Sequence, residues 1–151
     1  MSTQIERESL LTQLTSAFAR KDNVQILKAM RADVDIEVPG ESPLAGKHQG
    51  AEAVDRFLSA LRLVFAAEGA PSEYHHAGNE MVLTQTLRAR AALWEHHYRI
   101  VFDQDGRIER IVFEPNDVAG FDRLVKDALG DDPPASAAWM PPPGVEPGFT
   151  A

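Results

Sequence analysis

The side chains best suited to acid/base chemistry lie in one segment, LWEHHYRIVF, at positions 93–102. Its composition and spacing predict a β-strand, in which every second side chain points to the same face. One face of this strand carries apolar residues together with an imidazole and a phenol: Trp94, His96, Tyr98, Ile100 and Phe102. Because ligand pockets are mostly apolar with a few placed polar groups, we expect this face to line a pocket.

His96 and Tyr98 would stand about 6 to 7 Å apart along the strand, close enough to contact the same substrate. A histidine with a pKa near neutrality can give or take a proton, and a tyrosine hydroxyl can donate to a developing oxyanion. Both residues are therefore candidates for catalysis. The alternative is that they are core or interface residues bonded to the backbone or to a carboxylate, which is common for amphipathic side chains on half-buried strands.

Two carboxylates, Glu114 and Asp117, follow near the end of the last predicted strand. A carboxyl group held at the mouth of an apolar pocket has a raised pKa, which suits it to moving a proton. Asp117 is also placed to cap the following helix, where its charge meets the positive helix end, and capping is its favoured role. For Glu114, a solvated surface position is an equally good explanation.

The two histidine doublets, His75-His76 and His96-His97, do not predict a metal site. Adjacent residues on a strand face opposite sides, and strands two positions apart lie roughly 9.5 Å from one another, too far for two imidazoles to share a zinc ion. His48 is expected to be a packing residue. The chain has no cysteine, which excludes disulfides, thiolate metal sites and cysteine nucleophiles. We expect no metal and no other cofactor.

The composition is typical of an ordinary single-domain globular protein, with 151 residues, 44% of them hydrophobic and 25% charged. A net charge of -8 and the lack of a Lys/Arg cluster argue against nucleic acid and anionic membrane surfaces as partners. No apolar run approaches the roughly 18 residues of a membrane span, and the charged N-terminal segment predicts a helix and not a signal peptide. We therefore expect a cytoplasmic protein.

Hydrophobic periodicity divides the chain into the elements that must position these residues. Helices are predicted at about 5–20, 22–30, 51–63 and 117–129, and strands at 33–38, 72–77, 80–88, 93–103 and 107–114. In the second helix, Val24, Leu27 and Met30 are expected to face inward. Asp105-Gly106 predicts a tight hairpin between the last two strands, because this pair tolerates the positive φ that such turns require.

The segment 30–50, MRADVDIEVPGESPLAGKHQG, and the order of elements around it resemble the NTF2-like superfamily and its SnoaL-like domains. The best-matching parts are Lys21-Asp22, residues 33–50 and the turn at 105–108. The resemblance covers about residues 5–117. It implies a cone-shaped α+β fold, with three N-terminal helices packed on a strongly curved antiparallel sheet. The predicted helix at 117–129 would be an extra C-terminal helix outside this common core. The domain is predicted to span 1–130, followed by a Pro-rich acidic tail at 131–151 that is disordered or extended.

The resemblance also implies a cofactor-independent enzyme that cyclises, isomerises, hydrates or dehydrates a small apolar molecule in the pocket. Its catalytic candidates are His96, Tyr98, Glu114 and Asp117. Candidate ligand-binding residues are Trp94, Ile100, Phe102, Val38, Leu14 and Phe57. Ketosteroid isomerases resemble this chain too, but Val38 and Leu14 occupy the positions of their base and phenol donor, which disfavours steroid isomerisation.

The alternative hypothesis is a non-catalytic NTF2-like domain that binds a small ligand or serves as a dimeric accessory protein. In either case the expected ligand is a small apolar or aromatic molecule. NTF2-like relatives commonly pack the outer faces of their sheets together. We therefore expect a homodimer through the outer face of the 93–103 strand, which carries Glu95, His97, Arg99 and Val101.

Overall fold

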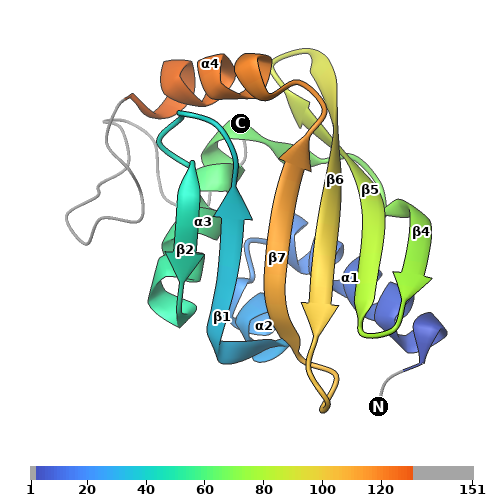
Figure 1. Cartoon of the computed structure of the whole chain (residues 1–151). Helices are drawn as coiled ribbons and strands as arrows, with labels where there is room; N and C mark the ends of the chain where they lie inside the picture. Colours follow the sequence, from blue (N-terminus) through green and yellow to red (C-terminus); the bar gives the residue numbers. More distant parts are fainter. Residues whose placement is uncertain (1–2, 131–151) are drawn as a thin grey trace.

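The computed structural model of the chain describes residues 3–130 (Figure 1). The helices in this range are α1 (Gln4–Ala19), α2 (Asn23–Lys28), α3 (Ala51–Val64) and α4 (Val118–Leu129). The strands are β1 (Met30–Val38), β2 (Gly46–Gln49), β3 (Ala66–Ala67), β4 (Ser72–Ala77), β5 (Glu80–Ala89), β6 (Ala92–Phe102) and β7 (Ile108–Pro115). The predicted tail at 131–151 lies outside the described residues.

All the strands join one sheet in the order β2-β1-β7-β6-β5-β3, and β4 also pairs with β5. The predicted α+β class is confirmed. The expectation of a purely antiparallel sheet is wrong at one pair, because β1 and β7 run parallel, as their arrows in Figure 1 show. Side-chain alternation reveals which face of a strand is buried but not the direction in which the strand runs beside its neighbour.

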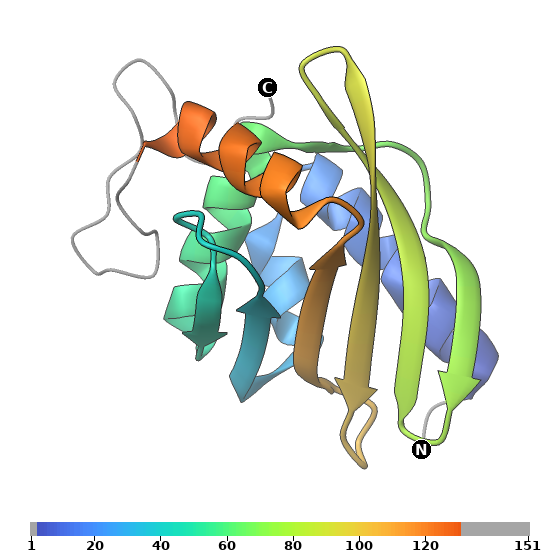
Figure 2. The ribbon, with the colours of Figure 1, turned by 45° about the horizontal axis from the view of Figure 1, so that its top comes forward.

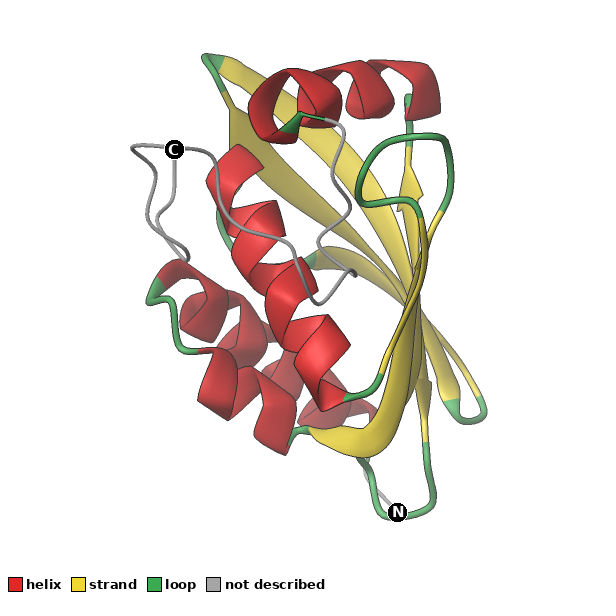
Figure 3. Ribbon diagram, turned by 90° about the vertical axis from the view of Figure 1, so that its left-hand side faces the viewer, coloured by secondary structure: helices red, strands yellow, loops and turns green. Residues whose placement is uncertain are grey.

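Three helices cover one face of the curved sheet, and α4 lies across one end of it (Figures 2 and 3). No element within residues 3–130 packs over the opposite, outer face of β5, β6 and β7. The sheet therefore has one buried concave face, which forms the site, and one face that no other element of residues 3–130 covers.

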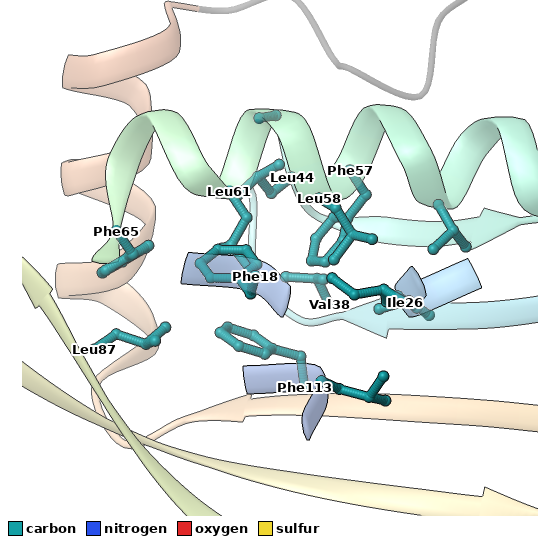
Figure 4. Close-up of a cluster of buried hydrophobic side chains, with 14 of the residues drawn as sticks. Phe18, Ile26, Val38, Leu44, Phe57, Leu58, Leu61, Phe65, Leu87 and Phe113 are labelled. Atoms are coloured by element: carbon teal, nitrogen blue, oxygen red, sulfur yellow. The ribbon is translucent and has the colours of Figure 1, made fainter. Parts of the chain in front are cut away.

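The core forms where the helices meet the concave face of the sheet, as Figure 4 shows for part of it. The helix α3 contributes the apolar stripe that its spacing predicts: Val54, Phe57, Leu58 and Leu61, with Phe65 directly after the helix. These side chains meet strand residues such as Leu83 and Phe113, which are almost fully buried. Burying each such side chain stabilises the fold by about 1.5–3 kcal/mol.

The short helix α2 presents a different face to the core from the one predicted. Ile26 is its buried residue, whereas Val24 is 64% exposed. The helix has only six residues, so the spacing of its apolar residues does not fix its orientation. The preceding turn does, because Lys21 adopts a left-handed conformation (φ 63°) and Asp22 caps the helix.

Helix α4 is fastened to the loop between β1 and β2 through Asp122. The Asp122 carboxylate accepts hydrogen bonds from the backbone N–H groups of Glu41 (2.8 Å) and Ser42 (3.2 Å). The adjacent Gly40 has a positive φ of 98°, and a Cβ atom there would collide with the same carboxylate. This contact holds α4 in place beside the loop. Helix α4 in turn contributes Phe121, whose ring packs against His96.

Candidate functional site

The concave side of the sheet encloses a cavity of about 120 Å³ between β1, β5, β6 and β7 and the helices α1 to α3. Most of its lining is aliphatic or aromatic. The labelled residues of Figure 4 that belong to this lining are Phe18, Ile26, Phe57, Leu58, Leu61, Leu87 and Phe113. An apolar cavity of this kind is how proteins hold small organic ligands.

Three polar side chains line the cavity, Thr15 from α1, Gln85 from β5 and Tyr98 from β6. The Gln85 amide nitrogen donates to the carbonyl oxygens of Gly69 (3.2 Å) and Thr86 (3.0 Å). Among residues 3–130, no carboxylate, imidazole, amine or guanidinium group lines the cavity. The lining can therefore orient an oxygen-bearing ligand, but it offers no group that is a base near pH 7.

Tyr98 occupies the place expected from the sequence. Its ring lies 5.0 Å from that of Phe113, and its hydroxyl forms no hydrogen bond with any other described residue. Burial raises the pKa of the Tyr98 phenol above its usual value because the charged form is disfavoured away from water. The hydroxyl therefore stays protonated and can donate to a ligand oxygen.

His96 does not face this cavity, contrary to expectation. The imidazole has no exposed surface and packs among three aromatic rings, with centroids 4.8 Å from Phe113, 5.5 Å from Phe65 and 5.7 Å from Phe121. Neither ring nitrogen has a hydrogen-bond partner among the described residues. Burial lowers the pKa of His96 to about 4, so the ring is neutral at pH 7.

Trp94, Phe102 and Val38 also lie outside the cavity lining, whereas Leu14, Phe57 and Ile100 belong to it. Trp94 and Phe102 do share the concave face of β6 with Tyr98. However, β6 has 11 residues and extends for about 36 Å, so one pocket meets only its middle. Phe102 packs instead beneath the Arg7 guanidinium, which lies 4.8 Å from its ring centre, and Val38 is part of the core.

The two carboxylates expected near the site point elsewhere. Glu114 is on the outer face of the sheet, where its carboxylate lies 3.8 Å from the Arg99 guanidinium. Asp117 caps α4, as predicted, by accepting a hydrogen bond from the backbone N–H of Gly120 (2.9 Å). The structure therefore does not bring His96, Tyr98 and the two carboxylates together in one site.

Thr15 and Gln85 were not among the residues predicted for the site. A signal for Gln85 was present, because it alternates with Leu83 and Leu87 on the inner face of its strand, where a polar residue needs an explanation. Thr15 follows Leu14 and lies four residues after Leu11 in the first helix, on the edge of the apolar stripe. Helical spacing alone places such a residue at the edge of the core without indicating a cavity there.

No group of three or more potential metal ligands converges within the described part of the chain. His48 is a packing residue, as expected: its Nε2 lies 2.7 Å from the carbonyl oxygen of Leu44 and its ring 4.7 Å from that of Phe57. None of the helices in residues 3–130 combines the length and the apolar character needed to cross a bilayer.

No protein-family model matches the sequence, and no curated protein matches it with significance. Several solved structures, however, are similar to the chain. An NTF2-like protein of unknown function from Burkholderia pseudomallei is 22% identical with a TM-score of 0.68, the match covering 79% of this chain and 96% of that one. TerC co-crystallised with polyporic acid is 22% identical with a TM-score of 0.64 (79% and 95% covered). A steroid delta-isomerase from Pseudomonas aeruginosa is 20% identical with a TM-score of 0.62 (81% and 87% covered). Together with the sheet order and the helices on its concave face, these similarities identify the chain's fold as that of the NTF2-like superfamily.

Proposed function

We propose that the protein binds a small, mostly apolar molecule in the cavity between the helices and the sheet, as a ligand-binding NTF2-like domain. The observation that carries this proposal is the lining. It is apolar except for Thr15, Gln85 and Tyr98, and it contains no ionised group from residues 3–130. Such a lining gains free energy from displacing water from apolar surface, while the few polar groups set the orientation of the ligand.

The volume of the cavity matches a ligand with a single ring. Its volume of about 120 Å³ is close to the roughly 150 Å³ of an apolar cavity that binds benzene. Support for a small organic ligand also comes from the neighbouring structure of TerC, which was co-crystallised with polyporic acid.

Filling the cavity tests the proposal. Toluene and phenol are titrated against the wild type and an Ile100→Trp variant, and binding is followed by ligand-observed NMR and by the rise in melting temperature. The wild type is expected to bind at least one probe, and the variant to bind none, because the larger side chain occupies the space. The matched control is Val101→Trp, which places the same side chain on the outer face of the same strand and leaves binding intact. A wild type that binds no probe at millimolar concentration would contradict the proposal.

The second candidate is a cofactor-independent enzyme that moves a proton on the bound molecule. The unbonded Tyr98 hydroxyl favours it, because a buried donor of this kind can stabilise an oxyanion. The base would be His96, two residues away on the same face. Glu114 and Asp117, the other expected catalytic residues, would take no direct part, because Glu114 lies on the outer face and Asp117 caps α4. The Phe113 ring lines the cavity and packs against His96 on its other side. His96 could therefore act on a bound molecule only after this ring moved aside.

Proton exchange separates the two candidates. Cyclohexanone in D₂O is incubated with the protein, and loss of its α-proton signals is followed by NMR. A ligand-binding domain leaves the exchange rate at that of the buffer. Exchange that is accelerated by the wild type and abolished in both Tyr98→Phe and His96→Leu would instead support the enzyme.

A further inference from the structure

In the cavity wall, the amide nitrogen and the amide oxygen of Gln85 are not equally well hydrogen-bonded. This side chain is only 4% exposed, and its amide nitrogen is held by the carbonyl oxygens of Gly69 and Thr86. An amide NH₂ has two protons, so both are used. Reversing the amide would set its oxygen against two carbonyl oxygens, which fixes Oε1 on the side of Thr15.

Thr15 offers this oxygen only a long contact. Its hydroxyl has one proton and two neighbouring acceptors, the carbonyl oxygen of Leu11 at 3.0 Å and Gln85 Oε1 at 3.4 Å. The shorter contact is the ordinary bond of a helical threonine to the carbonyl four residues before it. No other side chain of residues 3–130 donates to Gln85 Oε1. The wall thus presents a buried acceptor whose side-chain donor among residues 3–130, Thr15, lies 3.4 Å away and has a closer acceptor.

Tyr98 provides the complementary group on the neighbouring strand. In the β5–β6 register Tyr98 pairs with Leu83, so Gln85 is its diagonal neighbour on the concave face, about 7–8 Å away between Cα atoms. Both side chains line the cavity. A bound ring can therefore face an unbonded hydroxyl donor and a weakly matched amide acceptor at once.

From this juxtaposition we propose that the ligand is a hydroxylated ring, a phenol or an enol, whose O–H donates to Gln85 Oε1 and whose oxygen accepts from the Tyr98 hydroxyl. This inference rests on the ligand-binding function proposed above and adds the chemical class of the ligand. Ethers and ketones of the same size lack the donor, so they leave the buried amide oxygen with only the long Thr15 contact and bind more weakly.

Phenol, anisole and toluene test this directly, because they share one ring and differ in the donor and the acceptor that they carry. Dissociation constants for the intact protein are measured by calorimetry or by ligand-observed NMR. The wild type is expected to bind phenol roughly tenfold more tightly than anisole. Equal affinities for phenol and anisole would overturn the inference while toluene or anisole binding still upholds the binding function. If none of the three binds, the binding function fails, and the inference falls with it.

Three variants assign the effect to particular atoms. Tyr98→Phe is expected to weaken phenol and anisole alike and to leave toluene unchanged. Gln85→Met is expected to bring the ratio of phenol to anisole affinity close to one. Because this variant also frees two carbonyl groups and can fail to fold, Thr15→Val serves as a second test. It keeps the shape of Thr15 and should leave the ratio unchanged; a higher ratio than in the wild type would show that Thr15 satisfies Gln85, contrary to the inference.

Discussion

A neutral imidazole buried among phenylalanine rings links the stability of this domain to pH. His96 has a pKa of about 4 in the folded protein, against about 6.5 in an unfolded chain. Below pH 6.5 the unfolded state therefore binds a proton that the folded state rejects until about pH 4. The free energy of unfolding then falls as the pH is lowered through this window and is independent of His96 above it.

We predict that, when the pH is lowered from 7 to 5, the free energy of unfolding falls by roughly 2 kcal/mol because of His96. The variant His96→Leu should lose that part of the pH dependence and should be at least as stable at pH 7, since it removes two buried nitrogens that have no partner. Urea unfolding at the two pH values measures both effects. His97→Leu, a change to the neighbouring half-buried residue on the outer face, is the control and should keep the dependence. If His96→Leu shows the same pH dependence as the wild type, the imidazole is not buried in this way.

Among the secondary-structure elements, α4 has a start that is clearly encoded in the sequence. Asp117 precedes it, and the carboxylate accepts from the third helical N–H, that of Gly120. A Cβ atom on Gly120 would collide with this carboxylate, so the cap and the glycine depend on one another. The apolar side of the helix, which includes Phe121 and Val125, then packs over His96 and the neighbouring core.

We expect Asp117→Ala to lower the free energy of unfolding by about 1 kcal/mol, and Asp117→Ser to restore most of it because serine also caps helices. Chemical unfolding at pH 7 measures the difference. Asp127→Ala removes an exposed carboxylate from the other end of α4 and should have little effect, as it pairs only loosely with Arg90 (3.8 Å). Toluene binding should survive in Asp117→Ser; its loss there would point to a role for the carboxylate in the site.

The elements differ in how well the sequence predicts them, and the reasons are physical. The helix α3 and the strands β4 to β7 were predicted to within about one residue at each end, because each has several periods of alternating or helical burial. The strands β2 and β3, with four and two residues, were missed since they are too short to show a period. In the site, alternation correctly put Tyr98 and Ile100 on the concave face. It could not tell how far along β6 the cavity extends, and so it misplaced His96.

The outer face of the sheet, which no other element of residues 3–130 covers, is the most conspicuous surface of the protein. Its charges are largely matched within the face itself: the Arg99 guanidinium lies 3.0 Å from the carboxylate of Glu80 and 3.8 Å from that of Glu114. Between these charges lie half-buried valines, including Val101 and Val112. A two-fold axis can pack such a mixed, self-matched face on its own copy.

We predict that the protein is a homodimer through this face at micromolar concentration, measured as a molar mass by light scattering after gel filtration. Val112→Glu should shift the mass to that of the monomer, because it buries an unpaired charge at the interface. Val24→Glu, the same change at a highly exposed valine of α2, should leave the mass unchanged. A wild type with the mass of a monomer would count against the prediction.

The parallel pair of β1 and β7 has a consequence for the order of folding. The partners Asp35 and Arg110 are separated by roughly 75 residues of chain, so bringing them together costs roughly 2 kcal/mol more loop-closure entropy than closing a short hairpin. The strands from β4 to β7, joined by short turns, can therefore pair first and leave the β7 edge unpaired until β1 docks.

We expect substitutions of buried β1 residues, such as Ile36→Val, to speed unfolding and leave the refolding rate unchanged. Leu83→Ala, in β5, is expected to slow refolding. Stopped-flow kinetics in urea distinguishes the two effects. Until β1 docks, the exposed edge of β7 can pair with another chain, which makes slow refolding at high protein concentration the condition under which this protein aggregates.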